Sequence, residues 1–527
     1  MDSPTNYRPE TASACTKGVL THGRDVPAAK TALAVYLVLL VGFTALYTAT
    51  AQRDVSWQDH AIFQHRILHR DYAGTMGLAL AHPMYILMQQ AVLRIAPAGC
   101  ELWALNAFSG LGMAIALANL SLLVHRLTGR WWAGAGIALM LSVAHTAWWL
   151  STIVETYTWS LAGLSVECLL LVSLIRQPRW ATLAGLALVS GWGWSIHNLA
   201  LLPLPVHLTV MVYLMIRRRL PVWSVLPAVA AFGLGAAMYI GMIVARASSA
   251  GLPEAVHSAL FGGYRDDVFG VGTWAMVPYN LGLMALNGIS LLPLLAVVGW
   301  LKFRRRLGGE TALALAAITM IQVVFVVRYT VPDQFTFCLP ALWMTGLAGG
   351  VGLAVLAETP GRWRTWAVAG VALSLVAGPA AYALLPRLVN AQSLPGRELK
   401  DFRDEVRYWA MPWKHNEHSA DRFAQTVWRQ MKPVCDAGNE PIILLGTTPL
   451  FPVVITQDMQ RLCPRAQVQR DGRPLPLKRD AHAIRRAAGT RPIYVLSPQS
   501  IPRPLRAHVR AVKDHPDDVL YRLQWND

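Results

Sequence analysis

Long apolar runs separated by short polar breaks make up most of this chain. A helix needs about twenty apolar residues to cross the hydrocarbon core of a bilayer, and the runs have about that length. The pattern therefore predicts a polytopic α-helical membrane protein with about eleven transmembrane helices between residues 31 and 388. The count depends most on residues 191–205, where Pro203 and Pro205 break a continuous run. The predicted spans are 31–50, 101–124, 132–151, 157–175, 181–196, 199–216, 221–245, 275–300, 311–328, 335–356 and 365–386.

Short clusters of arginine and lysine fall at every second break between these spans. The clusters are Arg126/Arg130, Arg176/Arg179, Arg217–Arg219, Lys302/Arg304–Arg306 and Arg362/Arg364. Because positive charge in short loops stays cytoplasmic, they predict a cytoplasmic N-terminal tail over residues 1–30 and a C-terminus on the opposite side. We therefore expect a multi-pass protein of the bacterial inner membrane, whose remaining breaks face the periplasm.

The stretch 52–100 does not follow this alternation. Residues 77–96 are apolar enough to span the membrane, but counting them as a span would place every later arginine cluster outside. We therefore predict two helices that lie on the outer membrane surface and are joined near Ala81-His82-Pro83, as amphipathic interfacial helices do.

The pattern changes from about residue 389, where charge density rises and the apolar runs shorten. Two strand-like runs, PIILL at 441–445 and PIYVL at 492–496, alternate with helical patterns at 400–432 and 479–488. Such alternation is typical of an α/β fold, so residues 389–527 are predicted to form a C-terminal periplasmic α/β domain. Cys435 and Cys463 lie in this part, where an oxidising compartment allows either a disulfide or two free thiols.

The formal net charge of +17 raises the question of nucleic-acid binding. Much of this charge is the loop arginines, so membrane orientation accounts for it without nucleic acid. The sequence carries none of the short motifs for nucleotide binding, hydrolytic triads or zinc. We therefore expect membrane lipids, and no nucleic acid, among the partners.

Polar residues that are candidates for catalysis or binding gather at the breaks that are predicted to face outward. Asp59 follows the first span, where a carboxylate can take a proton from an attacking hydroxyl, although it could equally be a solvated loop acid. Glu155 and Tyr157 lie at the outer end of a span, and an acid at that depth is costly unless it is paired or hydrated. His82 and His197 lie at neighbouring outer turns, as structural groups or as contacts to phosphate or sugar.

Arg328 closes an apolar span at the side where arginine is disfavoured. A guanidinium at headgroup depth suits a lipid phosphate, through bidentate charge-assisted hydrogen bonds. The alternative is snorkelling or pairing with Asp333. Arg265 lies in another outer loop. His65 and His69 have the i, i+4 spacing of metal ligands, but without a third ligand we interpret them as a polar helix face and expect no metal and no cofactor.

Four stretches of the chain resemble one family of membrane proteins. They are Asp59-His-Ala-Ile-Phe63, Ala81-His82-Pro83, Trp149…Glu155-Thr-Tyr157 and Gly446-Thr-Thr-Pro-Leu-Phe451-Pro452. Together with the spans and the tail, they resemble GT-C superfamily glycosyltransferases, and within them a family of unknown function related to the protein O-mannosyltransferases. Two departures stand out: Ile62 replaces the family's loop glutamate, which leaves Asp59 without a nearby carboxylate partner, and Thr447–Leu450 replace acidic residues of its tail segment.

The resemblance implies transfer of a sugar, of mannose type, from a polyprenyl-phosphate donor to a hydroxyl of a protein, lipid or glycan acceptor. Asp59 would be the catalytic base of an inverting displacement, and Arg328, with Arg265 or His82, would hold the leaving phosphate. The sugar or acceptor pocket would be lined by Glu155, Tyr157, His197 and Asp333. Two alternatives stay open: a transporter or flippase of lipid-linked sugars, and a non-enzymatic envelope assembly protein.

Overall fold

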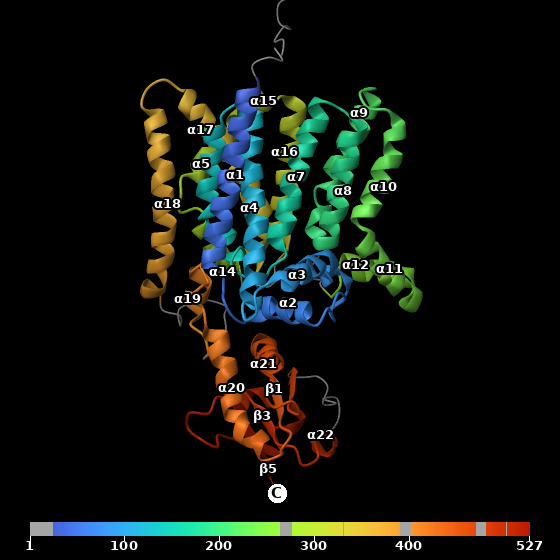
Figure 1. Cartoon of the computed structure of the whole chain (residues 1–527), viewed down its shortest axis with the longest axis vertical. Coiled ribbons are helices and arrows are strands. Elements are labelled where there is room, and N and C mark those ends of the chain that lie inside the picture. The colour runs from blue at the N-terminus through green and yellow to red at the C-terminus, as the bar shows by residue number, and fades with distance from the viewer. Residues whose placement is uncertain are drawn as a thin grey trace, which may run out of the picture.

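Long helices run side by side through most of the molecule, as the apolar runs predict (Figure 1). The computed structural model describes residues 25–263, 277–329, 331, 333–389, 402–470, 481–501 and 503–526. Two short helices, α2 (Gln58–Leu68) and α3 (Pro83–Ile95), lie across one end of the bundle, and a small sheet with its own helices lies beyond them. The fold is therefore that of a polytopic membrane protein with an added α/β part.

Seven helical segments in the described residues are long and apolar enough to cross a membrane, and an eighth is reached if one bent pair is counted. The seven are Lys30–Thr50 within α1 (Asp25–Thr50), α4 (Glu101–Thr128), α7 (Tyr157–Arg176), Asn198–Ile216 comprising η2 (Asn198–Leu201) and α9 (Leu204–Ile216), α16 (Gly309–Arg328), Gln334–Glu358 comprising η5 (Gln334–Cys338) and α17 (Leu339–Glu358), and α18 (Trp363–Leu388). The predicted count of eleven is not confirmed.

The other four predicted spans are short or broken. They become α5 (Trp131–Ser142) with α6 (His145–Leu150), α8 (Trp180–Ile196), α10 (Val225–Gly235) with α11 (Ala237–Ala250), and α14 (Val277–Leu286) with α15 (Leu292–Leu307). The pair α10 and α11 bends by 74° at its break. Asn287 joins two of the breaks, because its amide accepts from the Thr146 N–H and donates to the Thr146 hydroxyl. Backbone groups freed by a broken span are satisfied inside the protein in this way.

The helices differ in how much of their surface the protein covers. In their most apolar stretches, 72% of α4 and 78% of α7 are buried, against 17% of α1 and 22% of α18. Close packing within the bundle uses small residues. A Cβ at Gly352 of α17 would lie 2.0 Å from the Leu295 carbonyl oxygen of α15. Helices α4, α7 and α17 thus form the centre, and α1 and α18 the periphery.

The basic clusters meet at one end of the bundle. They form the ion pairs Arg130–Glu358, Arg306–Glu358 and Arg219–Glu310, and Arg176 donates to the Arg126 carbonyl oxygen. Helices α4 and α15 end there, whereas α2 and α3 cover the other end (Figure 1). Residues of four of the five basic clusters therefore lie near one another at this end.

The stretch 52–100 holds two α-helices, and the second begins at the predicted junction. His82 takes the left-handed conformation with φ of 51°, and α3 begins at the next residue, Pro83. The loop before it is held by Arg66, whose guanidinium donates to the carbonyl oxygens of Tyr72, Leu80 and Ala81 at 2.6–3.1 Å. Residues 77–96 therefore contain a thirteen-residue helix, α3, and no membrane span.

Five strands form the sheet of the C-terminal part, in the order β2-β1-β3-β5-β4. The two strand-like runs become neighbouring parallel strands, β1 (Ile442–Leu445) and β3 (Ile493–Val495). Every β1 residue is buried, as expected for a central parallel strand covered on both faces. The remaining strands and helices of this part are α19 (Glu405–Ala410), α20 (Ser419–Asp436), α21 (Thr447–Gln460), β2 (Gln467–Arg470), α22 (Ala481–Ala488), β4 (Val509–Val512) and β5 (Tyr521–Trp525).

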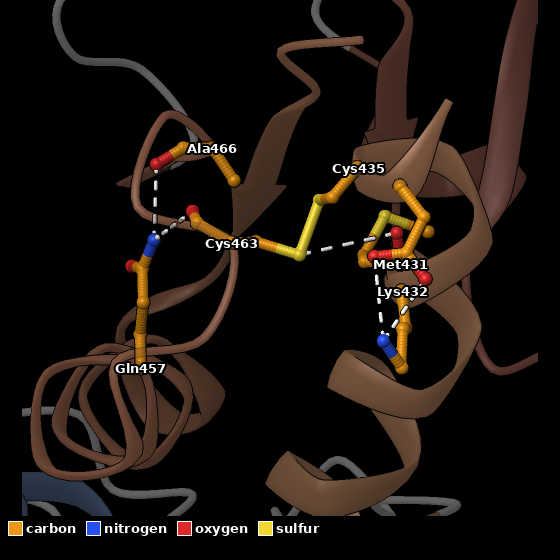
Figure 2. Close-up of a disulfide and its surroundings, with 7 residues drawn as sticks. Met431, Lys432, Cys435, Gln457, Cys463 and Ala466 are labelled. Atoms are coloured by element: carbon orange, nitrogen blue, oxygen red, sulfur yellow. Dashed lines mark hydrogen bonds and ion pairs between the residues drawn. A yellow bond between two sulfur atoms is a disulfide. The ribbon is translucent and has the colours of Figure 1, made fainter. Parts of the chain in front are cut away.

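A disulfide braces α20 against the segment that follows α21 (Figure 2). It joins Cys435 to Cys463, with 5.8 Å between the Cα atoms, so the disulfide alternative holds in the structure. Gln457 of α21 adds to this brace by donating to the carbonyl oxygens of Cys463 and Ala466 at 3.0 and 3.1 Å. The C-terminal end of α21 is thereby fixed.

Candidate active site

A cavity of about 830 Å³ lies where α2 and the end of the bundle face α21. Five of the predicted site residues line it: Asp59, His82, Glu155, Tyr157 and His197. They come from four separate parts of the chain, and the turns after α1, α6 and α8 bring them to the same end of the bundle.

Two acidic groups form the polar centre of the cavity. Asp59 stands in the first turn of α2, and its charge interacts with that of Glu155 from the turn before α7. His60, next to Asp59, places its Nδ1 atom 3.0 Å from a Glu155 carboxylate oxygen, and both side chains are buried. The expectation that Asp59 lacks a nearby carboxylate, drawn from Ile62, is thus corrected. Glu155, which is distant from Asp59 in the sequence, supplies that carboxylate.

Burial shifts the pKa values of Glu155, Asp59 and His60. It raises the pKa of the Glu155 carboxyl to about 8, so this group is mainly protonated at neutral pH. Burial, followed by the charge on Glu155, also raises the pKa of Asp59, whose side chain nevertheless reaches solvent through the cavity. Burial lowers the pKa of His60 to about 4, so its ring is neutral. The site therefore places an acid that is exposed to solvent beside a buried acid that keeps its proton at neutral pH.

Side chains of α4 hold the loops that carry the two acids. The Asn106 amide donates to the Gln52 carbonyl oxygen and accepts from the Val154 N–H, both at 2.9 Å. The Ser109 hydroxyl accepts from the Glu155 N–H at 3.1 Å. All of these groups are buried, so each lost bond would leave an unpaired polar atom.

The histidine wall of the cavity offers one acceptor and one donor. His82 Nδ1 lies 2.7 Å from the Ile196 carbonyl oxygen and must donate to it, which leaves Nε2 as an acceptor. His197 Nδ1 accepts from the Leu199 N–H at 3.0 Å, so its Nε2 carries the proton. The two rings stack with centroids 5.0 Å apart, and Tyr157 lies 5.2 Å from His197.

This geometry argues against a phosphate role for His82. Burial, and then the nearby His197 and Arg66, lower the pKa of its imidazole well below the ordinary value. A neutral ring with a free acceptor atom repels an anion but suits a hydroxyl. We therefore expect His82 to contact a sugar or acceptor hydroxyl.

Of the predicted arginines, Arg328 is described, and it does not line the cavity. The Arg328 side chain is exposed at the end of α16, although the next residue, Tyr329, lines the cavity. Asp333 is the N-cap residue that precedes η5; it also lies outside the lining, within electrostatic range of Tyr157. Arg265 lies outside the described residues.

Sequence reasoning missed two basic groups that do line the cavity, Arg66 and Arg470. Arg66 shares a helical face with Asp59, Ile62 and Phe63, because positions i, i+3, i+4 and i+7 coincide on a helix. This helical spacing from Asp59 could have identified Arg66 as a site residue. Arg470 ends strand β2, and its position at the cavity depends on how the sheet packs, which no local pattern encodes.

The C-terminal part contributes one wall. Thr447, Leu450 and Phe451 of α21 line the cavity, and the Phe451 ring meets the His65 ring edge-on with centroids 5.2 Å apart. The stretch Gly446–Pro452, chosen from the sequence for its resemblance, thus lies at the site. Asp458 of α21 lies near His65 and His69, which the sequence did not predict, so three residues that can act as metal ligands come together.

The chain before the sheet covers the back of the acidic centre. The Lys414 N–H donates to the Thr50 carbonyl oxygen at 2.8 Å, and its buried ammonium lies 5.4 Å from the centre of the Trp149 ring. Burial lowers the pKa of Lys414 to about 7. Trp149 also stacks on Trp409 of α19, with centroids 5.3 Å apart. These contacts attach the C-terminal part to the end of the bundle and close the rear of the site.

No known family model matches the chain. No curated protein matches it by sequence either. Among solved structures, ArnT from Cupriavidus metallidurans bound to undecaprenyl phosphate is similar with a TM-score of 0.57 at 13% identity, and its apo state with 0.52 at 14%. Each comparison covers 94% of this chain and 98% of ArnT. The arabinosyltransferase EmbB from Mycobacterium smegmatis has a TM-score of 0.41 at 14% sequence identity, and the comparison covers 76% of this chain and 41% of EmbB. The chain therefore shares the fold of ArnT over nearly its whole length.

Proposed function

We propose that this protein is a GT-C membrane glycosyltransferase that moves a sugar from a polyprenyl-phosphate donor to an acceptor hydroxyl. The fold it shares with ArnT supports this, since that protein binds undecaprenyl phosphate in one of its structures. The mannose-type sugar, the inverting course and the kinship to protein O-mannosyltransferases remain parts of the proposal, and they rest on the sequence resemblance.

The observation that carries the proposal is the pair of acids, Asp59 and Glu155, in a cavity of about 830 Å³ at the end of a membrane bundle. Such a cavity is large enough for a sugar with its phosphate and an acceptor side chain. Asp59 takes the proton from the acceptor hydroxyl, whose oxygen then attacks the anomeric carbon. The protonated Glu155 holds a sugar or acceptor oxygen by donating a hydrogen bond. His82, His197 and Tyr157 select the remaining hydroxyls.

A cation must stabilise the leaving phosphate. Arg328 and Arg265 remain the proposed ligands, because each lies close in sequence to a residue that lines the cavity, Tyr329 and Phe261 respectively. Arg66 contributes its charge from a fixed position, since its guanidinium donates four hydrogen bonds to loop carbonyl groups. Its role is to shape the site and raise the local positive potential.

The proposed orientation follows from the two ends of the bundle. The end with the arginine clusters faces the cytoplasm, so the cavity and the C-terminal part face the periplasm of a bacterial inner membrane. Donor lipid then enters from the outer leaflet, and the acceptor comes from the periplasm as a protein, lipid or glycan.

One observation favours the flippase alternative. Glu167 lies in the middle of α7 and is buried. Ionisable groups at that depth often mark a transport pathway. A flippase would lose lipid movement in Glu167→Gln, whereas a transferase would lose sugar transfer in Asp59→Asn.

The test supplies purified protein with a radiolabelled polyprenyl-phosphate sugar and periplasmic extract. Asp59→Asn should lower the transfer rate by about 10²–10⁴-fold, the usual contribution of a general base. Asp436→Asn, which changes an exposed acid paired with Lys432, is the matched control and should transfer normally. Near-normal transfer by Asp59→Asn would remove Asp59 from the mechanism. A wild type that moves the labelled lipid without transferring the sugar would establish the flippase instead.

A further inference from the structure

His65 of α2, His69 at the C-terminal cap of α2 and Asp458 of α21 converge beside the cavity. His69 Nε2 lies 3.0 Å from an Asp458 carboxylate oxygen, and the His65 and His69 rings have centroids 4.3 Å apart. One ligand atom from each of the three residues lies within 4.8 Å of the others. We propose that these residues bind a zinc ion that clamps α21 onto α2.

The chemistry of the ligand set points to zinc. Two imidazoles and one carboxylate form a common three-ligand set for Zn²⁺, with a water molecule in the fourth tetrahedral position. Ligand atoms at ~2.0–2.2 Å from a tetrahedral ion lie about 3.4 Å apart, so small side-chain rotations suffice to close the observed group. His65 and Asp458 belong to regular helices, and His69 is the residue that caps the C-terminal end of α2.

The surroundings leave room for an ion. His69 and Asp458 are about half exposed, with side-chain values of 47% and 43%, so an ion can enter from solvent. His65 is less exposed, and the Phe451 ring holds it edge-on. The ion would therefore lie at the rim of the cavity, with its protein ligands on the inner side and water on the outer side.

The site would join the two walls of the cavity. Helix α2 carries Asp59 and Arg66, and α21 contributes Leu450 and Phe451. The disulfide and Gln457 already fix the C-terminal end of α21, so a zinc ion bound at Asp458 would also restrain the sheet that follows. Zinc would thus fix the position of the C-terminal part over the bundle. This inference concerns binding and holds whether or not the protein transfers sugar.

The first test measures zinc binding by the full-length chain in detergent. The protein carries an affinity tag without histidine, is stripped with a chelator, and is titrated with Zn²⁺ in competition with a chromophoric chelator. We expect one equivalent in the wild type and an affinity at least about 100-fold weaker in Asp458→Asn and in His69→Ala, since each removes a direct ligand. Asp458→His should restore tight binding.

The matched control is the exposed pair His515 and Asp517, which has the same two residue types 3.6 Å apart. His515→Ala and Asp517→Asn should bind zinc like the wild type. Failure of the wild type to bind one equivalent, or equal binding by Asp458→Asn and the wild type, would overturn the proposal. Monodisperse elution of each variant shows that it is folded.

The second test asks whether the ion acts as a clamp. Zinc should raise the melting temperature of the wild type and of Asp458→His, because a ligand that binds only the folded state stabilises it. It should leave the melting temperature of Asp458→Asn unchanged. A shift that is equal in all three proteins would show that the ion binds elsewhere and would refute the clamp.

Discussion

The pKa of Glu155 makes a quantitative prediction about stability. Burial holds a proton on this carboxyl up to a pH of about 8, whereas the ordinary pKa is 4.5. Between these two values the folded state keeps a proton that the unfolded state has lost. Stability therefore falls as the pH rises from 4.5 to 8 and levels off above. Glu155→Gln preserves size and a hydrogen-bond donor but cannot titrate, so it should remove this slope.

The magnitude follows from the same pKa values. At ~1.4 kcal/mol per pKa unit, the difference between 4.5 and about 8 amounts to roughly 5 kcal/mol, of which about 3 kcal/mol is lost between pH 6 and pH 8. Unfolding entropy of ~2.1 cal/mol/K per residue gives about 1.1 kcal/mol/K for a chain of 527 residues. The wild type should thus lose about 3 °C of melting temperature relative to Glu155→Gln between pH 6 and pH 8.

The assay is thermal unfolding in one detergent at closely spaced pH values from 6 to 9. Glu254→Gln is the control, because this solvated glutamate lies 3.6 Å from Arg246 on the protein surface. Its melting curve should follow the wild type at every pH. Parallel curves for the wild type and Glu155→Gln would refute the reasoning, since they would mean that Glu155 titrates alike in the folded and unfolded states.

Two further changes probe the frame around the site. Asn106→Leu removes both hydrogen bonds that hold the acidic loops and should cost about 2–4 kcal/mol, because two buried backbone groups lose their partners; the melting temperature measures this. Gly352→Ala places a Cβ 2.0 Å from the Leu295 carbonyl oxygen and should destabilise the bundle by about 1–3 kcal/mol. In Gly42→Ala the new Cβ meets nothing within 4 Å, so equal melting of the two alanine variants would contradict the packing argument.

Features that repeat locally along the chain could be predicted from the sequence. The runs at 441–445 and 492–496 are strands because β-branched and aliphatic residues follow one another there, and the turn at His82 precedes a proline that starts a helix. The breaks at 143–144 and at 236 could not be predicted, since apolar residues continue through them. Their backbone groups are satisfied by partners from other helices, and hydropathy does not record such partners.

The site likewise has residues that the sequence predicted and contacts that it could not predict. Asp59 and Glu155 stood out because acids are costly beside apolar spans, and both line the cavity. Their interaction could not be predicted, because it joins α2 to the turn before α7 across about 95 residues of chain. Asp458 is a stronger case, as it meets His69 across 389 positions. Pairings of this kind depend on how whole segments pack.

The sparse burial of α1 and α18 has a consequence for how such proteins diverge. A surface that faces lipid requires only that its residues be apolar, so exchanges among leucine, valine, isoleucine and alanine there change the free energy little. The central helices α4 and α7 must also fit their neighbours in shape. Substitutions thus accumulate over the periphery without disturbing the backbone. Two chains can therefore share a fold at 13% identity, as this chain and ArnT do, because the lipid-facing positions restrict the sequence so little.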